Sequence, residues 1–142
     1  MSVRDFRQGR SILARLDHGG EIIGSITALA EEMNIAMGTF SVIGALSRAE
    51  LAYYDQGARQ YRKTVLDRAV ELASCTGNIS IRDGKPFVHA HAVLSDSDFK
   101  TMAGHLASGT IFAAELYLVE LAGEMLTREF DPHTGLFLWE GR

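Results

Sequence analysis

The chain has 142 residues, a formal net charge of −4 at pH 7 and one cysteine. This length fits a single domain, residues 1–142, which is large enough to bury a core without covalent staples. Hydrophobic residues make up 46% of the chain and charged residues 23%, as in soluble globular proteins. A single cysteine excludes an intrachain disulfide. The negative net charge disfavours a surface that binds nucleic acid without sequence preference.

The cellular location is predicted from features that the sequence lacks. No apolar run approaches the length of a membrane span, and residues 1–10 carry charges without the apolar segment of a secretory signal. We therefore expect a cytoplasmic protein with no membrane partner. Cys75 lies in an alternating apolar segment, which predicts a small buried side chain rather than a nucleophile.

Residues 11–16 predict a first strand, and a helix follows it. The apolar side chains of this helix recur with helical spacing: Ile22, Ile26, Leu29 and Met33. We expect the helix to begin at Glu21, whose negative charge suits the positive end of the helix dipole. We expect it to end at Asn34, because asparagine tolerates the left-handed backbone of a helix stop.

From residue 39 onward the pattern is that of strands. The expected strands cover residues 39–54, 59–66, 70–81, 86–94, 110–121, 125–130 and 136–139. The first of these should bend near Gly44, and Asp83-Gly84 predicts a type I′ hairpin turn. Seven or eight strands and one main helix give an α+β fold with a mostly antiparallel sheet.

The segment 110–121 is apolar on both of its faces. A strand buried on both faces is either central in its sheet or covered by another subunit, so this segment suggests self-association. Glu115 interrupts it, and a buried carboxylate needs a partner. Two interpretations stay open: Glu115 accepts a hydrogen bond from a metal-ligating imidazole, or it pairs with an arginine at an edge or subunit interface.

Three of the five histidines fall within one short window: His89, His91 and His105. His89 and His91 lie two apart on an expected strand, so their side chains point the same way. His105 is expected on a loop, beside Gly104, whose missing side chain lets that loop approach the strand. The alternative is that these imidazoles are half-buried and hydrogen-bonded to backbone or hydroxyl groups.

Three neutral imidazoles are ligands that suit zinc or a similar divalent ion. They leave a fourth position for water, which is the arrangement of catalytic rather than structural zinc sites. No serine is flanked by a nucleophile-elbow motif. The sequence therefore assigns no catalytic residue and leaves open whether the protein is an enzyme.

Several short segments carry a family resemblance through their order and spacing. They are Gly20-Glu21-Ile22, Ile43-Gly44-Ala45-Leu46, Thr76-Gly77-Asn78-Ile79-Ser80, Asp83-Gly84-Lys85-Pro86, His89-Ala90-His91-Ala92, Gly104-His105-Leu106 and Ala114-Glu115-Leu116-Tyr117-Leu118. Over about residues 10–140 the chain resembles the plant-and-prokaryote-conserved (PPC) domain family in its stand-alone form. It departs from the family pattern at Ala103, where the family usually has glycine.

This resemblance implies an α+β fold that assembles as a homotrimer. It also implies a divalent metal, often zinc, held by His89, His91 and His105. In plants the same domain follows an AT-hook that enters the DNA minor groove, and this chain has no such segment. Direct DNA binding is therefore poorly supported by its own residues.

Two hypotheses of function follow. In the first, a trimer with three-histidine metal sites binds or turns over a small molecule in a pocket at the metal. In the second, the trimer is a DNA-associated regulatory or oligomerisation module, and the metal is structural.

Overall fold

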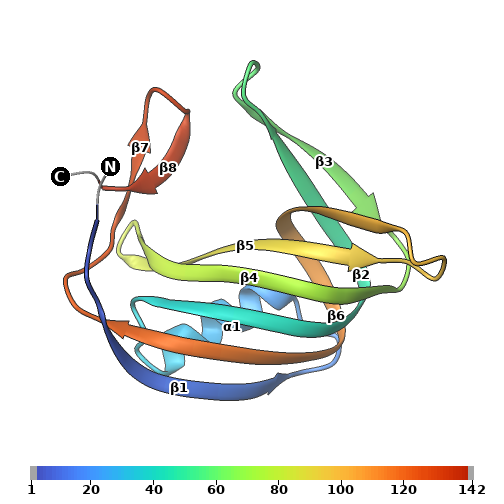
Figure 1. Cartoon of the computed structure of the whole chain (residues 1–142), viewed down its shortest axis with the longest axis horizontal. Helices are drawn as coiled ribbons and strands as arrows, with labels where there is room; N and C mark the ends of the chain where they lie inside the picture. Colours follow the sequence, from blue (N-terminus) through green and yellow to red (C-terminus); the bar gives the residue numbers. More distant parts are fainter. Residues whose placement is uncertain (1–2, 141–142) are drawn as a thin grey trace.

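The computed structural model describes residues 3–140, which form one helix and eight strands (Figure 1). The elements are β1 (Arg7–Leu16), α1 (Ile22–Glu32), β2 (Gly38–Asp55), β3 (Gln60–Leu66), β4 (Val70–Arg82), β5 (Lys85–Ser95), β6 (Thr101–Ala122), β7 (Arg128–Asp131) and β8 (Leu136–Trp139). The predicted α+β class is confirmed. The part of the chain that the structure describes holds no helix with the length and apolar character of a membrane span.

Six strands form one sheet in the order β1-β6-β5-β4-β2-β3, and all of their pairings are antiparallel. Because β2 also pairs with β6, the strands β2, β4, β5 and β6 form a closed circuit. The strands β7 and β8 form a separate hairpin. In Figure 1 this hairpin and the β2–β3 hairpin rise on the same side of β5.

The 22-residue strand β6 begins nine residues earlier than the sequence predicts. Its first residues pair with β5, its middle with β2 and its last third with β1. His105 therefore lies on a strand, and the expected loop is confined to residues 96–100. Small residues such as Ala103 and Gly104 give this part of β6 little strand propensity, and pairing with β5 overrides that weakness.

The core lies between helix α1 and the curved sheet. The buried face of the helix is formed by Ile22, Ile26 and Ala30. Glu21 caps the helix, and its carboxylate accepts hydrogen bonds from the backbone N–H groups of Ile23 and Gly24 at 3.1 and 2.6 Å. Asn34 follows with a φ of 54°, so both predicted helix ends are confirmed.

Two predicted glycine-dependent features of the backbone are also confirmed. Gly44 has a φ of 147° beside a shift in the β2–β4 register. A Cβ atom there would lie 2.1 Å from the carbonyl oxygen of Ala113, so no other residue fits this bulge. Asp83 and Gly84 have φ values of 52° and 75°, as a type I′ turn requires.

The prediction that segment 110–121 is buried on both faces is wrong for a single chain. One side packs into the core, while the other belongs to an exposed surface of β1, β2 and β6 that we call the outer face. Four large apolar side chains mark it: Leu13, Ile43, Phe112 and Tyr117, which are 82%, 56%, 60% and 44% exposed. Because successive side chains of a strand point to opposite faces, a strand of apolar residues is apolar on both faces. The sequence does not tell whether the chain itself covers the second face.

Candidate metal centre

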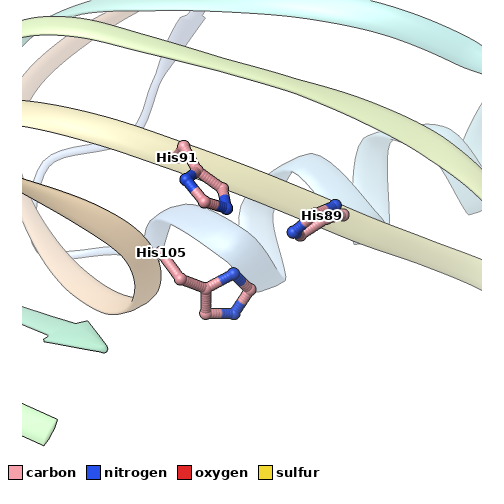
Figure 2. Close-up of side chains that lie close together, drawn as sticks. All are labelled: His89, His91 and His105. Carbon is pink, nitrogen blue, oxygen red and sulfur yellow. The ribbon is translucent and has the colours of Figure 1, made fainter. Parts of the chain in front are cut away.

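His89, His91 and His105 converge on one point (Figure 2). His89 and His91 lie two residues apart on the same face of β5, and His105 on β6 stands directly opposite His91 in the strand register. One ring nitrogen of each residue lies within 4.8 Å of the others. The ring centroids are 5.2 to 5.5 Å apart. One ion placed among the three rings is therefore within reach of all of them.

Gly104 allows a close approach, as predicted, but to β2 and not to the strand that carries His89 and His91. A Cβ atom on Gly104 would lie 2.9 Å from the carbonyl oxygen of Ala52 on β2. The missing side chain therefore lets β6 approach β2, where Ala52 and His105 are paired. Gly104 also lines the pocket described below. It positions His105 by allowing close packing of a strand, not by folding a loop.

The environment favours the neutral form of His89 and His105. Burial lowers the pKa of His89 to about 4, and the nearby His105, Arg128 and His91 act in the same direction. Burial lowers the pKa of His105 as well, with further contributions from His91 and Lys63. Neutral imidazole is the form that binds metal ions.

The three rings lack hydrogen-bond partners. His105 Nδ1 is buried without one, and no hydrogen bond within residues 3–140 satisfies His89 or His91. The alternative of imidazoles satisfied by backbone or hydroxyl groups is therefore wrong. A buried unpaired nitrogen costs about 1–3 kcal/mol, and a bound cation would remove that cost. The donor set thus fits a divalent metal.

The histidines lie in a pocket of about 640 Å³. Strands β4, β5 and β6 supply its floor, and the β2–β3 and β7–β8 hairpins supply its walls. Tyr54 ties the two walls together, because its hydroxyl donates a hydrogen bond of 2.6 Å to the carbonyl oxygen of Thr134. The ring of Tyr61 lies against His105, with centroids 5.3 Å apart.

Two arginines in the pocket escaped the sequence analysis. Arg128 donates hydrogen bonds to Ser80 and Asn78 on β4, and Arg82 lies further along the same strand. The position of Arg82 could have been predicted from the Asp83-Gly84 turn, because that turn fixes the β4–β5 register. That register places Asn78 directly opposite His89. The arrival of Arg128 from the distant strand β7 had no sequence signal.

The structure does not bring Glu115 to the histidines of its own chain. Glu115 is exposed on the outer face, and the register places it opposite Arg15 on one side and Ile43 on the other. It is not among the residues that line the pocket. Within residues 3–140 Glu115 forms no ion pair with an arginine, and β6 is paired on both sides there, so the second interpretation, an arginine pair at a subunit interface, stays a prediction.

Cys75 is buried on the core side of β4, as predicted. It is 1% exposed, and burial raises the pKa of its thiol to about 11. The thiol is therefore protonated at neutral pH and unsuited to nucleophilic attack.

Comparison with known proteins shows close relatives of the whole fold. A metal-containing protein from Archaeoglobus fulgidus is 40% identical, with a TM-score of 0.94 over 99% of both chains. A plant- and prokaryote-conserved (PPC) protein from Pyrococcus horikoshii is 34% identical, with a TM-score of 0.95 over 100% of this chain and 99% of that one. A candidate DNA-binding protein from Ralstonia eutropha is 31% identical, with a TM-score of 0.81 over 90% and 89% of the two chains.

Among curated proteins, the chain is 29% identical over 124 residues to the bifunctional protein GlmU of Synechococcus sp. (strain JA-3-3Ab). The match covers 85% of this chain but spans only 19% of the length of that relative. Residues 3–122 match the Plants and Prokaryotes Conserved (PCC) domain. With most of its length in that match, the chain belongs to the Plants and Prokaryotes Conserved domain family.

Proposed function

We propose that this protein is a homotrimer that binds a divalent metal, zinc, through His89, His91 and His105, and a small molecule in the adjoining pocket. The observation that carries this proposal is the cluster of three unpartnered imidazoles, with nitrogens within 4.8 Å, in a pocket of about 640 Å³. The metal-containing relative from Archaeoglobus fulgidus, 40% identical, supports the same assignment.

The arrangement suits ligand binding at the metal. Three histidine ligands leave a coordination position open, and it would face the pocket. A bound divalent ion would act there as a Lewis acid toward an oxygen of the ligand. Tyr61 restrains the His105 ring, and the aromatic walls exclude water from the bound molecule. The proposal covers binding or turnover, and assigns no catalytic residue.

Metal analysis of purified protein tests the metal site. We expect about one ion per chain in the wild type, from one three-ligand site. His89→Ala, His91→Ala and His105→Ala should each lose it. His133→Ala is the matched control, since His133 lies exposed in the β7–β8 turn. Unchanged metal content in all three variants would refute the assignment.

Thermal-shift screening with a metabolite library tests the pocket. A true ligand of the metal site should raise the melting temperature of zinc-loaded wild type more than that of the chelator-treated protein. The same ligand should lose its effect in His91→Ala. Ligands that stabilise wild type and His91→Ala equally would exclude binding at the metal.

The outer face supports assembly of the trimer. Leu13 and Tyr117 are paired across β1 and β6, so their exposed side chains adjoin. Ile43 and Phe112 extend the same apolar surface. Exposed apolar patches of this kind mark protein–protein contacts, and the homotrimer implied by the family resemblance would cover this one.

Light scattering tests the oligomeric state. We expect three times the chain mass of 15.5 kDa, and dissociation in Leu13→Asp. Phe130→Asp is the control, because Phe130 is 58% exposed but lies on β7, away from the outer face. A monomer at micromolar concentration would contradict the proposal. A reducing cytoplasm, where we place the trimer, suits the free thiol of Cys75.

The alternative is a DNA-associated module in which the metal is structural. The Ralstonia eutropha relative, a candidate DNA-binding protein 31% identical to this chain, favours it. The net charge of −4 opposes it. Binding of duplex DNA at physiological salt, retained in His91→Ala that has lost its metal, would favour this alternative over the first proposal.

A further inference from the structure

We propose that Arg82 and Arg128 form the anion-binding half of the pocket, and that the ligand is a small organic oxyanion, a carboxylate or a phosphate. The inference rests on the proposed function for the metal-bound end of the ligand. The anion-binding end depends on protein side chains alone, and so it can be tested without metal.

Arg128 is fixed beside the histidines by two residues of β4. Its Nη2 donates to Asn78 Oδ1 and its Nε to Ser80 Oγ, both at 2.8 Å. In the β4–β5 register Asn78 stands opposite His89, and Ser80 opposite Phe87. Paired residues of neighbouring strands share a face. The guanidinium of Arg128 therefore lies on the same surface as the metal-binding imidazoles.

Arg82 is held on that surface by aromatic rings. Its Cζ lies 3.6 Å from the centroid of Phe137 and 5.4 Å from that of Phe87. Its Nε is buried without a hydrogen bond. The nearest carboxylate is that of Asp83, 3.5 Å from this Nε but 85% exposed to water. Arg82 is thus positioned by packing, and its charge is poorly neutralised.

The charge of the pocket is unbalanced. Its lining contains both arginines but, within the described residues, no aspartate or glutamate. The two arginines are close enough that Arg82 contributes, after burial, to lowering the pKa of Arg128. Elsewhere Arg10 and Arg68 pair with carboxylates. In an acidic chain, this pocket concentrates the charges of two arginines, and among the described residues only the exposed Asp83 forms an ion pair with either of them.

Donor counting shows what could complete the site. A guanidinium has five N–H groups, and Arg128 uses three of them, on Ser80, Asn78 and the carbonyl oxygen of Phe137. Two remain, and an oxyanion is the acceptor that arginine binds best. The rings of Tyr54, Tyr61 and Phe87 also line the pocket. They suit a ligand with an apolar, planar body.

Calorimetric titration of the metal-free and zinc-loaded protein tests the inference. The probes are benzoate, phenyl phosphate and the neutral analogue benzamide. We expect saturable binding of at least one anion to the metal-free wild type, and about tenfold weaker binding of benzamide, the difference expected for a charge-assisted hydrogen bond. The stronger of the two anions identifies carboxylate or phosphate as the preferred group.

Matched variants assign the effect to the arginines. Arg82→Gln should weaken anion binding about tenfold, and Arg48→Gln should leave it unchanged. Arg48→Gln removes the same charge as Arg82→Gln, but Arg48 lies outside the pocket and pairs with the exposed Asp67. Arg128→Lys keeps the charge while losing the planar fork, and should also weaken binding. Thermal melts confirm that each variant is folded.

Three results would overturn the inference. They are equal affinity for benzoate and benzamide, unchanged anion affinity in Arg82→Gln, and no saturable binding of either anion up to about 10 mM, a weak affinity for any specific site. Failure of the proposed metal site is a separate result. In that case metal-free wild type still binds the anion, Arg82→Gln binds it about tenfold more weakly, and His91→Ala binds it as well as the wild type.

Discussion

The two faces of the β4–β5 hairpin are built on one backbone and differ in almost every physical property. The core face is apolar and closed to water, with Cys75, Ile79, Val88, Ala90 and Ala92 all 7% exposed or less. The pocket face carries Thr76, Asn78 and Ser80 on β4 and Phe87, His89 and His91 on β5. Because side chains alternate along a strand, each face is set by every second residue.

The two faces also differ in how their groups are satisfied. Burial of the core face stabilises the fold by about 25 cal/mol per Å² of apolar surface. The pocket face opposes stability, since the buried Nδ1 of His105 lacks a partner and Arg128, within residues 3–140, hydrogen-bonds only to neutral groups. Folding explains the first face. The second places three histidines where they could hold a metal ion.

The largest effect should come from the core face. Ile79 is 1% exposed, and Ile79→Ala should lower the free energy of unfolding by about 2–5 kcal/mol, because it removes buried methyl groups and leaves a cavity. Thr76→Ala, on the pocket face of the same strand, should change it far less. Urea unfolding of both variants measures the contrast. Similar losses in the two variants would break the comparison.

A bound metal should offset the loss of stability that the unpartnered groups of the pocket face cause. Zinc at a hundred times its dissociation constant should stabilise the wild type by about 2.7 kcal/mol, since it binds the folded chain. The effect should vanish in His91→Ala and persist in His133→Ala. Melting with zinc and with chelator measures it. Equal stabilisation of all three proteins would place the zinc elsewhere.

The pH dependence of the metal-free protein should sharpen the comparison further. The pKa of His89 is about 4 in the folded protein and 6.5 ordinarily. Between these two pH values the imidazole is protonated in the unfolded chain and neutral in the folded chain. Stability should therefore fall as the pH drops from 6.5 to about 4. His89→Gln should flatten that decline in melts at a series of pH values. Parallel curves would contradict the assignment.

The smallest effect should come from a polar pair outside the pocket. Arg10 and Glu120 form a bidentate ion pair at 2.7 and 2.9 Å, which lowers the pKa of Glu120 to about 2. Its contribution is present above the ordinary pKa of 4.5 and disappears as the pH falls to about 2. Glu120→Gln should lower the melting temperature slightly at neutral pH and not at all near pH 2, because exposed pairs contribute little. A large loss at neutral pH would be inconsistent with this assignment.

Much of the fold could be predicted because local chemistry determines it. The helix ends at Glu21 and Asn34, the bulge at Gly44 and the turn at Asp83-Gly84 each follow from one residue type in one backbone conformation. The shared face of His89 and His91 follows from the two-residue period of a strand. These features need no knowledge of distant contacts.

The remaining features depend on pairings between distant segments. His105 was predicted on a loop because Gly104 and its small neighbours have weak strand propensity, which β2 and β5 override. Arg128 reaches the site across the 48 residues that separate it from Ser80. Glu115 was predicted as buried because apolar neighbours surround it, although its own face is exposed.

The strand β6 has a consequence for biosynthesis. Its end pairs with β1, joining Arg7 to Ala122, so the first strand of the chain waits for one of the last. Contacts so distant in sequence slow folding, and a ribosome adds about 5–20 residues per second. The sheet therefore cannot close while the chain is still half made. The part of the outer face that β1 and β6 share is therefore completed only after residue 122 has been synthesised.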